Sequence, residues 1–278
     1  MKRQIKWGII STAKIAETDL IPAIKKSKNS ELVAVASRNK DKAAKFAKKN
    51  KIKKFYDSYK KICEDTNIDI IYNPLPNHLH VNSTVNAIKN NKHVLLEKPI
   101  TLKSKEVNII AQAAKKNKKI VKEAFMVRHH PQWQWVKKYI DSNKIGKVNG
   151  ITTLFSYKNL DPKNIRNIKR YGGGGLYDIG CYAIVISRYL FNKEPKKVIC
   201  EANFDKKFKT DNLTSGILDF NGVYSNFIIS TCSTVSQQVL ILGSKKTICI
   251  ENPFNAKAHK DTTVVIYNGS SIYRKDNT

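Results

Sequence analysis

The N-terminal part of the chain alternates short apolar runs with segments of helical periodicity, and this alternation limits the possible fold most. Strands are predicted at residues 5–10, 31–36, 68–72, 93–96 and 119–124. Helices are predicted from the turn at 11–16 to about residue 26, then at 40–50, 59–64, 81–90 and 103–116. Strands that alternate with helices pair in parallel, with right-handed crossovers. We therefore predict a doubly wound parallel sheet.

The pattern changes after about residue 123, where longer β-rich segments replace the alternation. A helix is predicted at residues 132–140, a β-rich stretch begins at Gly146, and another helix continues through Leu190. Further strands are expected at residues 198–204, 213–220, 224–230, 238–242, 247–251 and 263–267. The chain has 278 residues, enough for two domains. We place their boundary near residue 123, with a mixed or antiparallel sheet in the second domain.

The segment Glu97-Lys98-Pro99 follows the predicted strand at residues 93–96 and fixes a charged residue at the end of that strand. Proline pushes the preceding residue into an extended conformation, so Lys98 is held where the chain leaves the sheet. Ligands of open α/β sheets bind at this carboxyl edge. Taken alone, a strand terminus with two solvated charges would be the better interpretation. The other motifs favour a functional one.

The turn after the first strand resembles a dinucleotide-binding fingerprint without its glycines. The three glycine positions of that fingerprint are occupied by Ser11, Ala13 and Ala16. Small side chains still allow a pyrophosphate to approach a helix N-terminus. A generic strand-to-helix turn is the alternative.

The end of the second strand lacks the acidic residue that normally binds the ribose hydroxyls of NAD. Ser37 and Arg38 stand there, and Lys42 lies in the first turn of the next helix. A hydroxyl and two cations suit a 2′-phosphate better than a diol, which predicts NADP with NAD as the second choice. An ordinary polar turn that caps the helix is the alternative.

A run of four glycines, residues 172–175, precedes Asp178 and Tyr182 in the second half of the chain. Glycines let backbone approach a ligand closely and leave amides exposed at a helix start. Asp178 and Tyr182 are four residues apart, so they are predicted to share a helix face. A buried tyrosine–aspartate hydrogen bond is the alternative. The glycine run, this pair and Lys98 together favour a catalytic site.

Composition excludes several classes of protein. The net charge is +29, but lysines are spread along the chain without a nucleic-acid-binding motif, so we interpret them mainly as solvated surface and expect no nucleic-acid partner. No apolar run reaches about 18 residues, and the N-terminus is too polar for a secretory signal. Five scattered cysteines without metal-type spacing predict reduced thiols, no metal site and a cytoplasmic location.

From Ile5 to about Phe254, these motifs resemble the Gfo/Idh/MocA family of nicotinamide-dependent oxidoreductases. The markers are Trp7-Gly8, Pro76-Asn77-His78-Leu79-His80, Glu97-Lys98-Pro99, the run from Glu123 to Arg128 with Pro131, the segment from Gly172 to Tyr182, Asp211-Asn212, and the run from Gly243 to Ile248. Many members carry histidine at the position of Tyr182. With tyrosine at this position, the chain resembles the subgroup of dimeric dihydrodiol dehydrogenases and D-xylose dehydrogenases.

The resemblance implies a Rossmann domain at residues 1–122. It also implies a substrate-binding and dimerisation α/β domain at residues 123–278, built on an open, largely antiparallel sheet. The implied cofactor-binding residues are Ser11, Thr12, Ala13, Lys14, Ile15, Ser37, Arg38, Lys42, Pro76, Asn77, His80, Glu97 and Lys98. The implied substrate-binding residues are Lys98, Arg128, Asp178 and Tyr182. The chain ends at Thr278 without the usual closing helical segment and is therefore expected to be a truncated or minimal member.

The expected reaction is hydride transfer between nicotinamide and a secondary alcohol or hemiacetal carbon of a sugar or cyclic trans-diol. Tyr182 would be the general acid/base, since a nearby Lys98 ammonium favours the phenolate of a group whose free pKa is about 10. Asp178 would orient Tyr182 or the substrate.

Two other functions remain open at this point. The missing glycines favour a non-catalytic, cofactor-binding regulator or scaffold, and the basic surface leaves nucleic-acid binding possible. The strands predicted after residue 196 form more sheet than the remaining helices can cover, which predicts a homodimer or a homotetramer.

Overall fold

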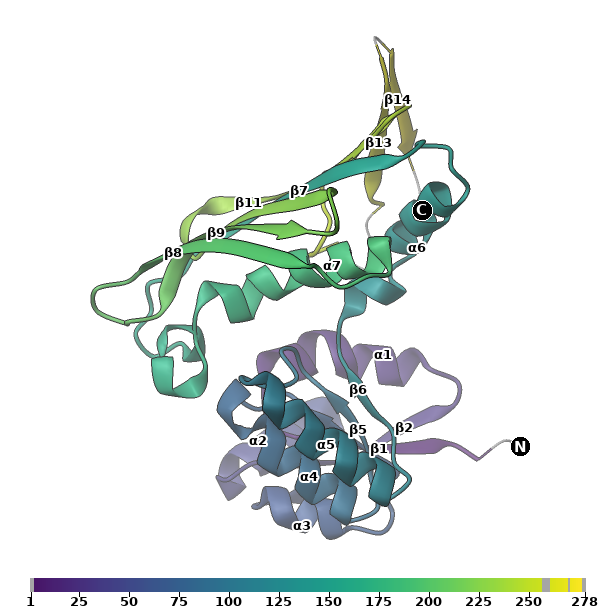
Figure 1. Ribbon diagram of the computed structural model, residues 1–278. Coiled ribbons are helices and arrows are strands. Elements are labelled where there is room, and N and C mark those ends of the chain that lie inside the picture. Colours follow the sequence, from purple (N-terminus) through teal and green to yellow (C-terminus); the bar gives the residue numbers. More distant parts are fainter. Residues whose placement is uncertain (1–2, 257–260, 270, 277–278) are drawn as a thin grey trace. The chain divides into compact units, whose positions relative to one another are not determined.

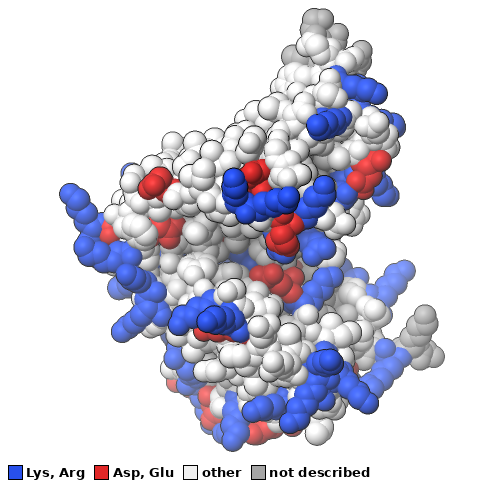
Figure 2. Space-filling view, in the orientation of Figure 1, with Lys and Arg blue, Asp and Glu red and all other residues white. Residues whose placement is uncertain are grey.

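The computed structural model describes residues 3–256, 261–269 and 271–276, and the chain divides into two compact units, Met1–Ala124 and Phe125–Thr278 (Figure 1). Within the described ranges, no helix combines the length and the apolar character needed to cross a bilayer. Each of the five cysteines is a free thiol. Lys and Arg side chains are spread over both units on the face that Figure 2 shows.

The described strands of the first unit form one parallel sheet in the order β3-β2-β1-β4-β5-β6. They are β1 (Ile5–Ile10), β2 (Ser30–Ala36), β3 (Lys54–Tyr56), β4 (Ile70–Asn73), β5 (His93–Leu96) and β6 (Val121–Glu123). The strand order reverses between β1 and β4. Open α/β sheets bind ligands beyond the carboxyl ends of their strands at such a reversal. The predicted doubly wound parallel sheet is confirmed.

Helices cover both faces of this sheet because neighbouring residues of one strand point to opposite sides. The helices are α1 (Ile21–Lys26), α2 (Lys40–Asn50), α3 (Tyr59–Glu64), α4 (His80–Lys89) and α5 (Ser104–Lys116). On one face, Ile9 and Val35 pack with apolar residues of α1 and α2. On the other face, Ile10 and Ala34 pack with α3, α4 and α5. The strands are therefore buried from both sides.

The local sequence determines where several helices begin. Asn39 caps α2 by accepting a hydrogen bond from the Lys42 backbone N–H at 2.9 Å. Ser58 caps α3, since its Oγ accepts from the Lys60 N–H at 3.1 Å.

In the second unit, the described strands form a mixed sheet in the order β14-β13-β12-β11-β7-β10-β9-β8. They are β7 (Val148–Lys158), β8 (Lys197–Phe204), β9 (Asp211–Asp219), β10 (Tyr224–Ser230), β11 (Cys232–Gly243), β12 (Thr247–Ile250), β13 (Thr263–Asn268) and β14 (Ser271–Asp276). Neighbouring strands are antiparallel, except that β7 and β10 are parallel. The α/β class and the largely antiparallel second sheet are confirmed.

Helices α6 (Pro131–Asp141) and α7 (Cys181–Phe191) pack on one face of this sheet (Figure 1). Trp133 of α6 and Ile186 of α7 share a buried core with Ile151 of β7. Several large apolar side chains of the same sheet remain exposed, namely Leu154, Ile199, Ile217, Tyr224, Ile228 and Leu242.

The strand predictions differ from the structure at three places. Residues 54–56 form β3, which is not among the strands predicted from the sequence. The short edge strand exposes Lys54 and Phe55, so no apolar pattern marks it. β11 begins at Cys232, six residues before the predicted start at residue 238. The prediction missed this part because the first five residues of β11 are all exposed and show no alternation. β14 was not predicted.

Candidate active site

The residues predicted to bind the cofactor lie along one edge of the first sheet. They follow the carboxyl ends of β1, β2, β4 and β5, which are neighbours in a parallel sheet. Ser11–Ile15 come after β1, Ser37–Lys42 after β2, Pro76–His80 after β4, and Glu97–Lys98 after β5. The fold thus brings these predicted segments of the first unit to one edge.

The turn after β1 tolerates the loss of the glycines. The Ala13 carbonyl oxygen accepts from the Ala16 N–H at 3.1 Å, and a π-helix (Ala16–Leu20) leads directly into α1. Ala16 is fully buried, so a small residue lets the helix pack on the sheet, as the third glycine of the fingerprint does. Lys14 and Ile15 are exposed at the start of the helix.

At the end of β2, the polar turn caps the next helix, as the alternative interpretation of the sequence predicted. The buried Ser37 Oγ accepts from the Asn39 N–H at 3.3 Å, and Asn39 caps α2. The side chains of Arg38 and Lys42 remain exposed. The turn therefore caps a helix and also presents two cations to solvent.

The backbone around Lys98 is held by neighbouring side chains. Tyr72 Oη donates to Glu97 Oε1 at 2.6 Å, and the Ile100 N–H donates to Glu123 Oε1 at 2.6 Å. Burial raises the pKa of Glu97, against the hydrogen bond from Tyr72 and the charge of Lys98. The residues that flank Lys98 are thus held by hydrogen bonds on both sides of it at the end of β5.

His80 supports this loop from inside the protein. Its ring is fully buried, with Nδ1 2.8 Å from the Pro99 carbonyl oxygen and Nε2 2.8 Å from the Leu75 carbonyl oxygen. Burial lowers the pKa of His80, although the two carbonyl oxygens favour the protonated ring. The imidazole therefore joins the segment after β4 to the segment after β5.

In the second unit, the glycine run makes room for the protein's own atoms. A Cβ on Gly173 would lie 2.4 Å from the Arg166 carbonyl oxygen, and one on Gly174, whose φ is +126°, would lie 2.0 Å from Asp211 Oδ1. The Leu176 N–H donates to Asp211 Oδ2 at 2.6 Å. The interpretation that this run exposes helix-start amides to a ligand is therefore wrong for Leu176.

Asp178 lies in a π-helix (Leu176–Gly180) that continues into α7. Its Oδ2 accepts from Tyr157 Oη at 2.6 Å and from Arg166 Nε at 2.8 Å. Burial, reinforced by Asp178, strongly raises the pKa of Tyr157, which keeps this phenol neutral. Asp178 is thus paired with Tyr157, which the sequence analysis did not single out, whereas the predicted pair was Asp178 with Tyr182.

Tyr182 lies in the first turn of α7 and is 8% exposed. Its ring packs against Phe125, Phe155 and Phe254, with centroid distances of 5.6, 6.0 and 5.4 Å. The guanidinium of Arg128 is placed 5.7 Å from the ring centroid of Tyr189, also on α7. The aromatic packing fixes the orientation of the Tyr182 ring.

The sequence reasoning assigned no role in the site to Tyr72, Tyr157, Arg166 or Asp211. Tyr72 and Tyr157 lie near the carboxyl ends of strands, a position that could have marked them. Arg166 lies in a short 3-10 helix (Ile165–Asn167) between strands and gave no such signal.

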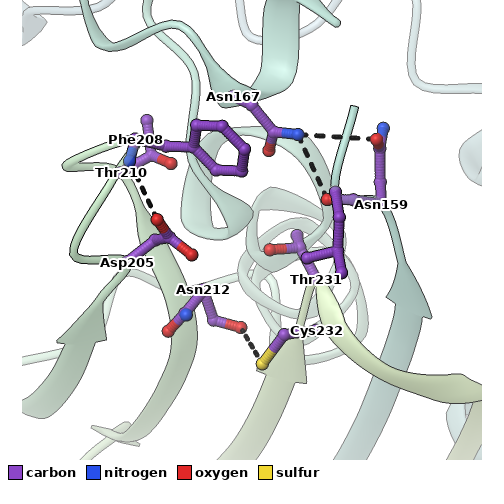
Figure 3. A pocket seen from close by; sticks show the side chains of 9 residues that line it. Asn159, Asn167, Asp205, Phe208, Thr210, Asn212, Thr231 and Cys232 are labelled. Carbon is purple, nitrogen blue, oxygen red and sulfur yellow. Dashed lines mark hydrogen bonds between the residues drawn. The ribbon is translucent and has the colours of Figure 1, made fainter. Parts of the chain in front are cut away.

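A small pocket in the second unit lies next to this segment, since its lining includes Asn167 and Asn212, the neighbours of Arg166 and Asp211 in the chain (Figure 3). It is lined by Asn159, Leu160, Asn167, Asp205, Phe208, Thr210, Asn212, Thr231 and Cys232. Its volume of about 10 Å³ has room for about one water molecule and none for a sugar.

A doubly wound sheet with a lysine at its carboxyl edge, followed by a unit with an open sheet, is typical of dinucleotide-dependent oxidoreductases. The family model for an oxidoreductase family with an NAD-binding Rossmann fold, GFO/IDH/MocA, matches residues 5–125. The model for the GFO/IDH/MocA C-terminal domain matches residues 133–249. The chain belongs to the GFO/IDH/MocA family, as its motifs predicted.

Relatives of known name agree with this assignment. The chain is 32% identical to a trans-1,2-dihydrobenzene-1,2-diol dehydrogenase of Xenopus laevis, over 88% of this chain and 74% of that protein. It is 31% identical to D-xylose 1-dehydrogenase (NADP(+)) 2 of Haloferax volcanii, over 84% of this chain and 71% of that protein.

A solved structure shows the same architecture. The 3-ketoreductase KijD10 of Actinomadura kijaniata, crystallised with NADP and TDP-benzene, is 25% identical and superposes with a TM-score of 0.93. The match covers 99% of this chain and 85% of KijD10. The resemblance to dihydrodiol and D-xylose dehydrogenases is confirmed.

Proposed function

We propose that this protein is a cytoplasmic dehydrogenase that transfers a hydride between NADP(H) and a secondary alcohol or hemiacetal carbon of a sugar or cyclic trans-diol. The observation that carries the proposal is Lys98, anchored at the carboxyl end of β5 by the contacts of Glu97 and Glu123. Named relatives that act on a diol and on D-xylose support the substrate class. Five free thiols support the location.

The chain's own residues have the following proposed roles. Tyr182 takes the hydroxyl proton during oxidation, and the Lys98 ammonium favours the phenolate that does so. Asp178 orients Tyr182 or the substrate. Arg128 contacts the substrate. When bound, the nicotinamide supplies the hydride chemistry.

The cofactor residues proposed here are those at the sheet edge. The turn of Ser11, Thr12, Ala13, Lys14 and Ile15 would hold the pyrophosphate. Pro76, Asn77, Glu97 and Lys98 would face the nicotinamide half. His80 would act from inside, since both its ring nitrogens lie against carbonyl oxygens.

A direct test begins with thermal unfolding in the presence of NADP⁺ or NAD⁺. A panel of aldoses and cyclic trans-diols, followed by nicotinamide absorbance, then identifies the substrate. Cofactor-dependent stabilisation without turnover on any substrate would instead favour a non-catalytic regulator.

We predict that an Arg38→Ala variant loses affinity for NADP(H) but keeps most of its affinity for NAD(H). The exposed guanidinium can hold a 2′-phosphate, and losing one charge-assisted contact costs ~1.5–3 kcal/mol, or roughly ten- to a hundred-fold in affinity. Titration of both cofactors measures this loss. Lys45→Ala removes an exposed cation from α2 and should leave both affinities near wild type. Equal losses of affinity for NADP and NAD in Arg38→Ala would show that Arg38 does not bind the 2′-phosphate.

We also predict a homodimer or a homotetramer that buries the exposed apolar side chains of the second sheet. Ile199 and Ile217 are paired neighbours on β8 and β9, and they are 66% and 39% exposed. Burial of such a patch against a second copy is favourable. Light scattering of wild type should give at least twice the monomer mass, and Ile199→Glu should shift it toward monomer. Leu160→Glu, which changes an exposed apolar residue in a loop, is the control.

A further inference from the structure

The loop between β7 and the glycine run holds Arg166 in a fixed position. Asn167, which is buried, donates from Nδ2 to the Asn159 carbonyl oxygen at 3.1 Å and to the Asp161 carbonyl oxygen at 2.9 Å. Figure 3 shows this amide directed at Asn159. The Gly174 N–H donates to the Arg166 carbonyl oxygen at 2.9 Å. Arg166 therefore lies on an ordered segment tied at both ends.

The guanidinium of Arg166 is fixed along one edge and open along the other. Nε donates to Asp178 Oδ2 at 2.8 Å, and Tyr157 occupies the same oxygen. Within the described part of the chain, Nη1 and Nη2 have no hydrogen-bond partner, and the side chain is 45% exposed. These two nitrogens form the distal fork of the guanidinium, which matches a pair of oxygen atoms.

Arg166 is also electrostatically coupled to the proposed acid/base. Burial lowers the pKa of Arg166, but the charge and hydrogen bond of Asp178, with smaller contributions from the neighbouring tyrosines, outweigh burial and raise it. Asp178, which holds Nε of Arg166, lies four residues before Tyr182 where the π-helix continues into α7, so Arg166 is attached to the turn that leads into Tyr182. A ligand that binds the two free nitrogens of Arg166 with one group could therefore present a hydroxyl to Tyr182 with another.

The charge of the surrounding loop selects the kind of ligand. Between residues 161 and 170 the chain has four cations, Lys163, Arg166, Lys169 and Arg170, and one carboxylate, Asp161. Asp178 neutralises one of these cations, and the segment stays positive. Its field favours an oxyanion over a neutral group.

We propose that Arg166 binds an oxyanion carried by the substrate, a carboxylate or phosphate attached to the sugar, through Nη1 and Nη2. The inference rests on the proposed function, and it narrows the substrate class from sugars in general to acidic sugars. Asp178 acts as the support that keeps the fork oriented, because its Oδ2 holds Nε.

The test compares three hexoses that share one ring: D-glucose, D-glucuronate and D-glucose 6-phosphate. Their affinities for the NADP⁺-loaded protein are measured by calorimetry, separately from turnover. Wild type should bind at least one of the two anions roughly ten-fold or more tightly than glucose. The anion that is preferred, carboxylate or phosphate, identifies the group that the fork accepts.

Variants of this loop distinguish direct binding of the anion by Arg166 from a purely structural role of Arg166 beside Asp178. Arg166→Gln should lose roughly ten- to a hundred-fold in affinity for the preferred anion, with glucose unchanged. Arg166→Lys keeps the charge without the fork and should recover only part of the loss. Arg170→Gln removes the same charge from the same segment and should retain the preference for the anion. Thermal unfolding of each variant verifies folding.

Two results would overturn the inference. One is a wild type that binds both anions no more tightly than glucose. The other is an equal loss of affinity for all three hexoses in Arg166→Gln, because this would mean that Arg166 only supports Asp178. If Arg166→Gln does not fold, the same result in Arg166→Lys decides. An anion preference that depends on Arg166, without turnover on any sugar or diol, would contradict the proposed function and leave this inference standing.

Discussion

A Tyr182→Phe variant is expected to bind the cofactor like wild type and to turn over roughly 10²–10⁴-fold more slowly, the usual contribution of a general acid/base. The substitution removes only the hydroxyl. The phenyl ring can keep its packing against Phe125, Phe155 and Phe254, so the core of the second unit should be preserved. Single-turnover kinetics with the cofactor bound measures the loss at the chemical step.

Tyr189→Phe is the matched control, because it removes one hydroxyl from the same helix, α7. It should keep turnover within the error of wild type. Near-normal turnover of purified Tyr182→Phe would remove this tyrosine from the mechanism, whatever the cofactor affinity.

A Lys98→Met variant should lose turnover to a similar extent, roughly 10²–10⁴-fold, because the ammonium is proposed to favour the ionised tyrosine. Methionine retains the length and apolar stem of the side chain without its charge. Measurement of kcat/KM against pH provides a second readout. The pH of half-maximal oxidation should rise by about one unit or more when the cation proposed to favour the phenolate is lost.

Lys105→Met, at an exposed position in the first turn of α5, removes the same charge elsewhere and should be neutral. A Lys98→Met variant that changes cofactor affinity alone, with turnover and the pH profile unchanged, would assign Lys98 to binding and not to chemistry.

The fold could be predicted well where burial leaves a pattern in the sequence. Residues 40–50 coincide with α2 because Ala43, Phe46 and Ala47 form its buried stripe and Asn39 caps it. β10 coincides with the predicted range of residues 224–230 for a similar reason, since its buried and exposed residues alternate. The exposed beginning of β11 had no alternation to detect.

The site could be predicted less completely, because its side-chain contacts depend on tertiary structure. The cofactor segments could be placed at one sheet edge, since the ends of parallel strands must meet there. Nothing local to the glycine run shows that Asp211 of β9 reaches Gly174. The partners Tyr157 and Arg166 of Asp178 come from a strand and a loop, and their approach depends on how that loop folds. From the motif, His80 is predicted to contact the cofactor. Its burial between two backbone carbonyl oxygens depends on the tertiary structure and could not be predicted from the sequence.

The position of β7 in the second sheet sets the order in which this chain can fold during synthesis. β8, β9 and β10 form one meander and β11 to β14 another, and each meander joins strands that are consecutive in the chain. β7 is made before all of them, yet it lies between the two meanders and pairs with β10 and β11. The first sheet is complete once Glu123 has left the ribosome, whereas β7 must wait for residues up to Gly243. Such long-range pairing is slow, and unpaired strands invite aggregation, so the newly made second unit is the part that benefits most from chaperone protection.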